Sequence, residues 1–336
     1  MATIKQIAEA VGVSPSTASI VLRGDAVRRK VAAETAERVL QCAKEMGYQP
    51  DLSARRLRVS EKAPLVLGIY WSSEFKESMM RFIYGVQEEV LQQARNIETV
   101  IHQYQKGKLA QVLHTFRSCH AAIVCNALPN DIQAVREQAG SLPIIFYSRE
   151  LPDFTCVHQN HPEVGLMAAE VFVQHQKKRA LLLSPQSRFQ GMEQCENAFI
   201  RYVMAHGMSI QQIEVPHAMQ GGYDAGQTIA QLEPRPDCIF SFSDVLSFGL
   251  VKCFRDLHVR VPEDMEIISM GSFDRDMETF AAISLSVMEV PIGEMAQECV
   301  RQALYSLDHP TAPIRRVIVK TPYVARETCP AWQPEE

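Results

Sequence analysis

The chain has 336 residues, of which 46% are hydrophobic and 22% charged, and its formal net charge is −5 at pH 7. This length exceeds one typical domain, while no apolar run approaches the ~18 residues that a membrane span needs. The nine cysteines are scattered, odd in number and without a CxxC pair, which indicates buried thiols rather than zinc ligands or disulfides. The first residues, MATIKQIAEAVG, lack the apolar core of a signal peptide. We therefore expect a cytoplasmic protein of more than one domain, with no membrane partner, metal or cofactor.

Residues 3–24, TIKQIAEAVGVSPSTASIVLRG, predict two short helices that meet at a tight turn. Apolar residues recur at helical spacing from Ile4 to Val11, and Gly12 supplies the positive φ that often follows a helix. Ser14 then occupies the N-cap of the second helix and Pro15 its first position. The second helix, 15–22, is expected to bury Ala18, Val21 and Leu22 and to expose Ser16, Thr17, Ser19 and Ile20. This pattern is typical of a helix-turn-helix, whose second helix enters the DNA major groove, although any short helical hairpin also fits it.

The charge distribution favours DNA as the partner of this segment. Residues 1–60 contain ten Lys or Arg and six Asp or Glu, a net charge of +4, whereas the whole chain carries −5. A basic head on an acidic body is expected when only the head meets a polyanion. A third helix at about 33–46 is expected to close the core of the head with Val39, Leu40 and Ala43. Residues 51–62, DLSARRLRVSEK, have little apolar surface and predict a linker that orders on binding.

The remaining sequence alternates apolar strands with helical patterns. Strands are predicted at 64–71, 98–104, 121–127, 142–148, 179–185, 238–244 and 266–272, and helices at 79–94, 164–176, 195–207, 245–257 and 293–307. This alternation indicates parallel sheets with helices on both faces, and the run is long enough for two such sheets. No P-loop, GxGxxG, GxSxG or HExxH motif is present, so an enzyme has no catalytic apparatus in this sequence and is not expected.

Four motifs in the first 60 residues resemble the DNA-binding head and hinge of the LacI/GalR family of repressors. They are TIKQIAEAVGVSPSTASIVLRG at 3–24, VAAETAERV at 31–39, GYQP at 47–50 and ARRL at 54–57. The body resembles the periplasmic-binding-protein-like effector domain of the same family. The matching stretches are PDCIFSFSDVLSFG at 236–249, VRVPEDMEII at 259–268, ISLSVMEVPIGEMA at 283–296 and ARET at 325–328.

The resemblance implies an all-α helix-turn-helix head and an α/β periplasmic-binding-protein-like body of type I with two parallel-sheet subdomains. The expected divisions are a DNA-binding domain at 1–48, a hinge helix or linker at 49–62, and an effector-binding and dimerisation domain at 63–332. Within the body, one subdomain is expected at about 64–155 plus 287–313, and the other at 156–285 plus 314–332. Three chain crossings between them imply a hinge and a ligand cleft.

The family reads DNA bases from the start of the second helix, at positions that match Pro15, Ser16 and Ile20 here. Leu57 matches the hinge leucine that the family inserts into the minor groove; packing on its own body is the alternative. Ser14 is expected both to cap its helix and to donate to phosphate, while Arg28 either contacts phosphate or is simply solvated. The expected DNA contacts are Thr3, Ser14, Pro15, Ser16, Thr17, Ser19, Ile20, Arg28, Ala54, Arg55 and Leu57.

In the body, Asp244 follows a strand and precedes a helix, at the edge of a parallel sheet where ligands bind. By the resemblance it contacts the effector, whereas on local grounds it only caps its helix. Trp71, at the end of the first strand, is expected either to stack on a sugar ring or to fill the core. Cys195 stands where the family has an effector-binding arginine, and Arg188 is the suggested substitute. The expected effector contacts are Tyr70, Trp71, Ser73, Phe75, Arg188, Cys195, Asp244 and Asp274.

The sequence therefore predicts a homodimeric transcriptional regulator that binds a pseudopalindromic double-stranded DNA operator. Repression is the expected direction of regulation. Its operator affinity is expected to change with a small-molecule effector in the cleft, a sugar or a related metabolite. Because the cleft departs from the family pattern, a standard hexose is not assumed. Two alternatives remain open: control by a protein co-regulator, and a small-molecule receptor without a role at DNA.

Overall fold

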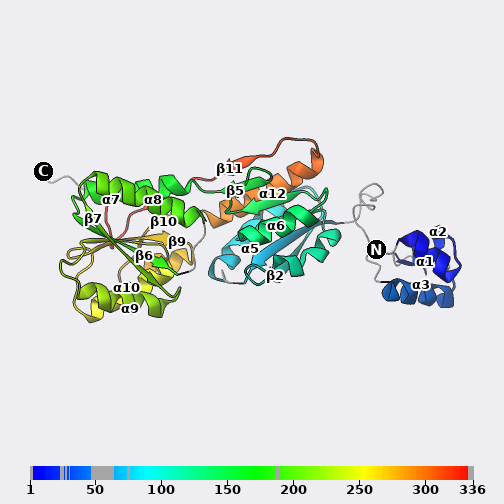
Figure 1. Cartoon of the computed structure of the whole chain (residues 1–336), viewed down its shortest axis with the longest axis horizontal. Coiled ribbons are helices and arrows are strands. Elements are labelled where there is room, and N and C mark those ends of the chain that lie inside the picture. The colour runs from blue at the N-terminus through cyan, green and yellow to red at the C-terminus, as the bar shows by residue number, and fades with distance from the viewer. Residues whose placement is uncertain are drawn as a thin grey trace.

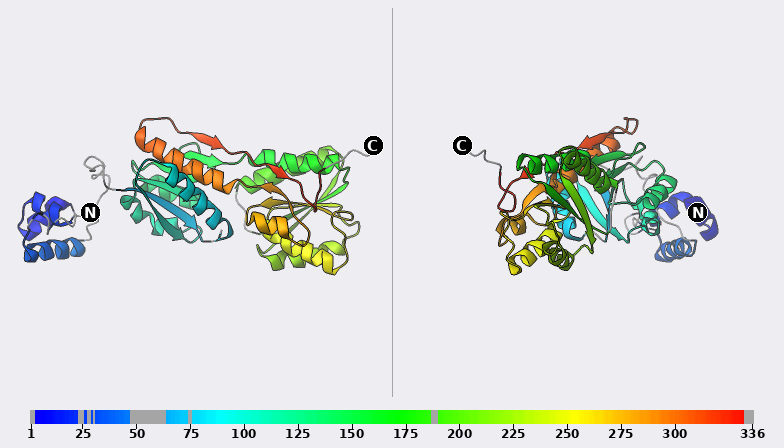
Figure 2. Two further views of the ribbon diagram at one scale, coloured as in Figure 1. Left: turned by 180° about the vertical axis from the view of Figure 1, so that it is seen from behind. Right: turned by 60° about the vertical axis from the view of Figure 1, so that its left-hand side comes forward.

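The computed structural model describes residues 3–22, 26, 29, 31–46, 64–73, 76–186 and 190–331. They form a small helical head and an α/β body of two subdomains (Figure 1). The view from behind shows head, first subdomain and second subdomain in succession (Figure 2). Within this described part of the chain, no helix is both long and apolar enough to cross a membrane.

In the described part of the head, three helices pack together: α1 (Ile4–Val11), α2 (Pro15–Leu22) and α3 (Ala33–Glu45). Their apolar faces meet in one core formed by Ile7, Ala8, Val11, Ala18, Val21, Val39 and Ala43. Leu40 was expected in this core, but it is 53% exposed. It follows Val39 directly on α3, and adjacent helical residues point about 100° apart, so both cannot face the same small core.

The first subdomain is a six-stranded parallel sheet in the order β11-β5-β4-β3-β1-β2. Helices α5 (Lys76–Gln92) and α12 (Ile292–Asp308) cover one face, and α6 (Pro129–Gln138) with two short 3₁₀ helices, Leu109–Gln111 and Leu113–Ser118, covers the other. The strands are β1 (Leu65–Ser72), β2 (Ile97–Tyr104), β3 (Ala121–Cys125), β4 (Ile144–Tyr147), β5 (Thr155–His158) and β11 (Arg316–Ile318).

The second subdomain is also a six-stranded sheet, in the order β12-β10-β9-β8-β6-β7, and its only antiparallel pair among the described residues is β10 with β12. Helices α7 (His161–Gln174) and α8 (Gln190–Ala205) cover one face, and α9 (Met219–Ala230) and α10 (Asp244–Asp256) the other (Figure 1). Helix α11 (Arg275–Phe280) follows β9. The strands are β6 (Arg179–Pro185), β7 (Ser209–Val215), β8 (Cys238–Ser241), β9 (Glu266–Gly271), β10 (Ser286–Glu289) and β12 (Tyr323–Val324).

Side chains alternate between two cores across each sheet, as expected for strands buried on both faces. On β6, Leu182 packs under α7 and α8, whereas Leu181 and Leu183 pack under α9 and α10. This arrangement confirms the predicted fold class. Strands β5, β7, β10, β11 and β12 are absent from the sequence-based strand list, because they are short or polar and carry little apolar periodicity.

The chain crosses between the subdomains three times, after β5, after β10 and after β11. These positions correct the boundaries predicted from the sequence. Residues 155–158 and 316–318 pair within the first sheet, and residues 286–289 pair within the second. Each crossing therefore lies a few residues later than expected, because β5, β10 and β11 still pair within their sheets beyond the predicted boundaries.

Candidate functional site

Capping interactions fix the turn of the head. The Thr3 hydroxyl accepts a hydrogen bond from the Gln6 amide at 3.3 Å, and the Gln6 side-chain oxygen accepts one from the Thr3 amide at 2.8 Å. Helix α1 ends at Gly12, whose φ is 74°, and the Val13 amide then donates to the Ala8 carbonyl at 2.9 Å. These bonds provide partners for backbone amides and carbonyls that the ends of a helix leave unpaired. The turn is thereby held by local interactions, which set the direction in which α2 leaves α1.

Helix α2 presents a small surface suited to a groove of DNA. Ser14 caps the helix, because its Oγ accepts from the Thr17 amide at 3.0 Å. Exposure falls along the helix: Pro15 and Ser16 are exposed, while Thr17, Ser19 and Ile20 are half-buried. None of these side chains is long and polar, so contact requires close approach of the helix to the bases.

One arginine of the head has a structural partner, and several expected DNA contacts are not described. The Arg38 guanidinium donates to the Val11 carbonyl at 2.8 Å and so gives a partner to a carbonyl at the end of α1. Four of the DNA contacts expected from the sequence lie outside the described residues: Arg28, Ala54, Arg55 and Leu57.

A polar cavity of about 420 Å³ lies between elements of the two subdomains. Its walls come from α5, α11 and the start of α12, and they include Arg81, Asp274 and Arg275. Arg81 reaches from the first subdomain to 3.7 Å from the carboxylate of Glu289, the last residue of β10, and the Nε of Arg275 donates to the same carboxylate at 2.7 Å. Charged groups from both subdomains thus meet beside the carboxyl ends of β9 and β10, where α/β sheets bind ligands.

Asp244 is fully buried at the start of α10 and is not among the residues that line this cavity. One carboxylate oxygen accepts from the amides of Ser272 at 2.8 Å and Phe273 at 2.6 Å, and the other accepts from the Val245 amide at 2.9 Å. The cap of α10 is its neighbour Ser243. Asp244 therefore orders the segment that leads from β9 to Asp274, a role that differs from both sequence-based alternatives.

Glu278 forms a buried carboxyl pair with Asp244. Burial and the neighbouring Asp244 charge raise the pKa of Glu278 to about 8, although Arg326, at 3.5 Å, opposes this shift. Burial also raises the pKa of Asp244, and the amides of Phe273 and Ser272 partly reverse that shift. Because backbone donors stabilise a charged Asp244, the shared proton belongs on Glu278 near neutral pH.

Tyr70 and Trp71 lie on opposite faces of β1, and both are fully buried. The Tyr70 hydroxyl is 2.8 Å from the Thr115 hydroxyl, within the core under α6. The Trp71 ring packs against Phe82 and Tyr147, at centroid distances of 5.0 and 6.0 Å. Of the two roles that the sequence left open for Trp71, the structure shows the core-filling one.

The remaining expected effector contacts are dispersed. Cys195 is buried in the core under α7 and α8, where burial raises the pKa of its thiol, so it does not replace the missing arginine. Ser73 is half-buried, and its amide donates to the Tyr104 carbonyl at 2.9 Å. Asp274 lines the cavity and caps α11 with one carboxylate oxygen. Phe75 and Arg188 lie outside the described residues.

Sequence reasoning missed Arg81, Arg275 and Glu278. Arg81 lies on a helix of the first subdomain and the other two belong to α11 of the second, so no local spacing connects them. For Arg275 the available signal was its position, because residues 274–276 begin two residues after the predicted strand 266–272 of a parallel sheet.

Family models match two parts of the chain. Residues 3–51 match the model of bacterial regulatory proteins of the lacI family, and residues 156–329 match a periplasmic binding protein-like domain.

Individual relatives match over nearly the full length. The HTH-type transcriptional repressor PurR of Mannheimia succiniciproducens is 23% identical, with 98% of each chain covered. The structure of the lac repressor dimer bound to operator and an anti-inducer has a TM-score of 0.70 at 18% identity, covering 98% of this chain and 99% of that one. The complex of the transcriptional regulator CelR with cellobiose has a TM-score of 0.69 at 18% identity, covering 98% and 100%.

Proposed function

We propose that this protein, which belongs to the LacI family of bacterial transcription regulators, is a cytoplasmic homodimeric repressor that releases or binds its operator in response to a small molecule. The family comprises DNA-binding regulators and not enzymes. Beyond family membership we propose three things: which residues contact DNA, where two copies pair, and where the effector binds.

The DNA contacts are assigned to the start of α2. Pro15 and Ser16 are exposed there, and Ile20 is half-buried on the same short helix. Ser16 offers a hydroxyl to a base edge, and Ile20 offers a methyl group to thymine. With so few hydrogen-bonding side chains, we assign a large share of specificity to DNA shape and to insertion of Leu57 at the operator centre.

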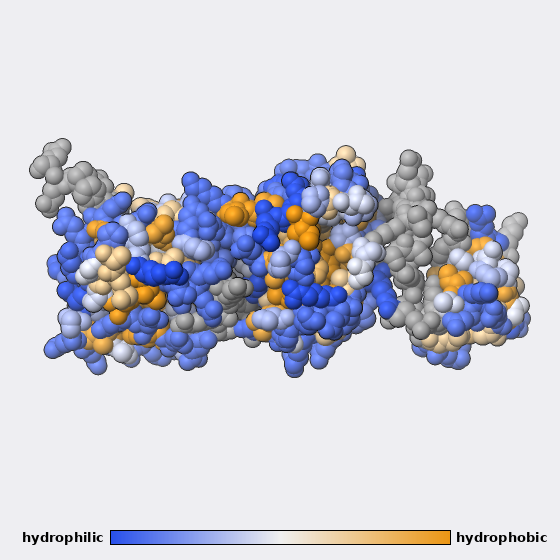
Figure 3. All heavy atoms as spheres, turned by 45° about the horizontal axis from the view of Figure 1, so that its top comes forward, coloured by the Kyte–Doolittle hydropathy of each residue, from blue (hydrophilic) through white to orange (hydrophobic). Residues whose placement is uncertain are grey.

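The dimer is assigned partly to α5. Met80, Tyr84 and Leu91 lie along one side of this helix, and they are 54%, 60% and 85% exposed. Figure 3 shows one face of the molecule, where hydrophobic patches stand out on the body among mostly hydrophilic side chains. Apolar patches of this kind support pairing of two copies, which matches the two-fold symmetry of a palindromic operator.

The effector is assigned to the cavity lined by Arg81, Asp274 and Arg275. Guanidinium and carboxylate groups bind polar, hydroxyl-bearing molecules, so a sugar or a related metabolite fits the lining. One observation carries the proposal: residues of both subdomains line this cavity. The same chain has a helix, α2, whose first residues are exposed and can reach DNA. A ligand that prefers one arrangement of the subdomains shifts the balance between two states, and operator affinity follows.

The test begins with a genomic selection for DNA that the full chain retains, followed by fluorescence anisotropy on the recovered palindrome. We expect tight binding that weakens steeply with salt, because phosphate contacts release counterions. Leu57→Ala should weaken operator binding about tenfold or more, a change of about 1.4 kcal/mol or above. Sugars and metabolites that stabilise the protein in a thermal-shift screen should then change the operator affinity.

The matched control is Arg58→Ala, one residue away from Leu57, which removes a charge but keeps the leucine. It should flatten the salt dependence without abolishing the preference for the palindrome. Failure to retain any DNA in the selection would contradict the proposal. Equal operator affinity in the Leu57→Ala variant would contradict the role given to the hinge.

A further inference from the structure

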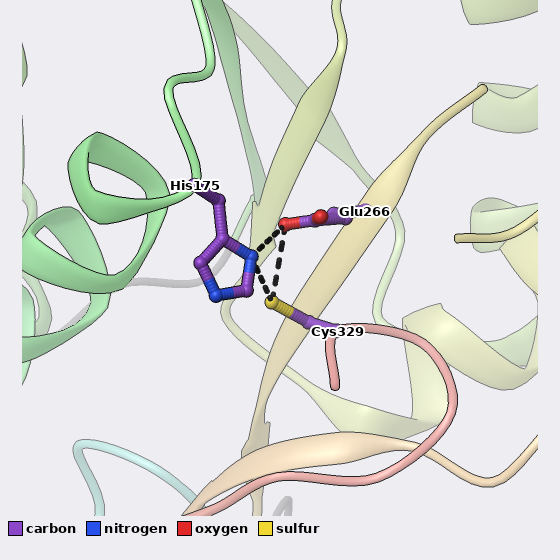
Figure 4. A group of neighbouring side chains, drawn as sticks. All are labelled: His175, Glu266 and Cys329. Atoms are coloured by element: carbon purple, nitrogen blue, oxygen red, sulfur yellow. Dashed lines mark hydrogen bonds and ion pairs between the residues drawn. The ribbon is translucent and has the colours of Figure 1, made fainter. Parts of the chain in front are cut away.

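Three side chains with metal-binding atoms converge in the second subdomain, and none of them lines the cavity (Figure 4). His175 is the residue that ends α7, Glu266 begins β9, and Cys329 belongs to the segment after β12. The His175 and Glu266 side chains are 7% and 11% exposed, and Cys329 is completely buried. Three separate elements thus bring one nitrogen, one oxygen and one sulfur atom together at a site that is largely shielded from solvent.

The distances among these atoms suit a single ion. Nδ1 of His175 lies 2.8 Å from Oε2 of Glu266, Sγ of Cys329 lies 3.3 Å from the same oxygen, and Sγ lies 3.9 Å from Nδ1. A point about 2.0 Å from all three atoms lies within this triangle, and Zn²⁺ bonds to such ligands measure about 2.0–2.3 Å. The Cys329 sulfur needs to move back only slightly for the longer zinc–sulfur bond.

The charges around the three atoms also fit a divalent cation. The carboxylate of Glu266 and a thiolate at Cys329 together balance the charge of Zn²⁺, while His175 binds as a neutral imidazole. Lys177 is 2.8 Å from Oε1 of Glu266, so it occupies the other carboxylate oxygen and leaves Oε2 for the ion. A nitrogen, sulfur and oxygen ligand set of this kind selects zinc over magnesium or calcium, which prefer oxygen ligands.

We propose that His175, Glu266 and Cys329 bind one Zn²⁺ ion, with water as the fourth ligand. On binding, the Cys329 thiol releases its proton to solvent. The ion fastens the segment after β12 to α7 and β9, where the Thr328 carbonyl already accepts a hydrogen bond from the Ile267 amide at 2.8 Å. The site is structural, and it does not depend on the DNA or effector assignments.

The test uses the full chain, treated with a chelator and titrated with Co²⁺, which reports its ligands through its absorption spectrum. We expect one equivalent of Co²⁺ to give a thiolate-to-metal charge-transfer band and tetrahedral d–d bands. One equivalent of Zn²⁺ should then remove these bands and raise the melting temperature. Cys329→Ser should abolish the charge-transfer band, and Glu266→Gln should weaken Co²⁺ binding about tenfold or more while keeping the band at saturation.

Cys253→Ser is the matched control, since Cys253 is a buried thiol on α10 outside the cluster. It should leave the Co²⁺ spectrum unchanged, and circular dichroism should confirm that each variant is folded. The proposal fails if the folded chain shows no thiolate band at one equivalent of Co²⁺. It also fails if the band persists in Cys329→Ser, and the three side chains are then only a hydrogen-bonded cluster.

Discussion

The Glu278 side chain is a buried acid with a raised pKa on α11, the helix that contributes to the cavity wall. It is 1% exposed, it adjoins Asp244, and its Oε1 has no hydrogen-bond partner among the described residues. A protonated carboxyl removes the cost of a second buried charge beside Asp244. The folded protein therefore holds a proton that the unfolded chain loses near pH 4–5.

This proton makes stability depend on pH. The pKa of Glu278 is raised on folding to about 8, so its contribution to stability is fully present below the unfolded pKa and is lost as the pH rises through 8. Unfolding free energy should fall by up to about 1.4 kcal/mol per pH unit across this window. In Glu278→Gln the fall between pH 6.5 and 8 should disappear, as measured by urea unfolding.

Glu263→Gln, at an exposed position, is the control and should keep the pH dependence of the parent chain. The buried His161 does not change stability in this pH range. Burial lowers its pKa to about 4, so its contribution to the unfolding free energy rises up to the unfolded pKa of about 6.5 and is constant above it. A Glu278→Gln profile identical to that of the parent would contradict a protonated Glu278.

At the scale of elements, α2 shows how one residue can serve two purposes. Ser14 accepts from the Thr17 amide and lies, exposed, at the positive end of the helix dipole. A cap and a phosphate contact are both expected from a hydroxyl in this position. The two purposes can be separated, because aspartate caps helices well but repels phosphate.

Ser14→Asp and Ser14→Ala are therefore predicted to differ. Ser14→Ala should destabilise the head by about 1 kcal/mol through loss of the cap, and Ser14→Asp should retain its stability. Operator affinity should nevertheless fall in Ser14→Asp, most strongly at low salt, because a carboxylate faces the DNA backbone. Head melting by circular dichroism and operator anisotropy provide the two measurements; unchanged operator affinity in Ser14→Asp would exclude a nearby phosphate.

At the scale of the whole molecule, the three crossing segments determine how the subdomains move together. They are joined to one another: the Thr321 hydroxyl of the third crossing donates to Oε1 of Gln159 in the first at 2.8 Å, and both residues are buried. The Glu289 amide, at the second crossing, donates to the Pro322 carbonyl at 2.9 Å. Hydrogen bonds between crossings therefore connect the two subdomains at the point where the chain passes from one to the other.

Thr321→Val is predicted to weaken this coupling. It replaces the hydroxyl by a methyl group of similar size and leaves Oε1 of Gln159 buried without its donor, which costs about 1–3 kcal/mol. The urea midpoint of the body should fall accordingly, while the head melts as before. Thr321→Ser, which keeps the hydroxyl, should lose less stability than Thr321→Val; the reverse order would show that packing of the methyl group matters more than the hydrogen bond.

The sequence alone determined the features that depend on neighbours in the chain. The caps at Thr3 and Ser14, the turn at Gly12 and the long apolar strands are local, because each depends on residues within a few positions. The four motifs of the first 60 residues, which resemble those of the LacI/GalR family, are likewise readable from the order of the residues alone. The short strands β10 and β12 escaped prediction, since two to four residues carry too little periodicity to be detected.

Only the tertiary structure decided which side chains meet. Asp244 appeared as a ligand contact or a cap, but it orders the segment before Asp274 and pairs with Glu278. Arg81 and Arg275 share a cavity, and His175 meets Cys329, although the members of each pair lie far apart in the chain. Sequence spacing cannot reveal such pairs, because they form only when the sheets assemble and the crossings bring distant elements together. The packing free energy that stabilises them comes from contacts between many segments, so no single segment encodes it.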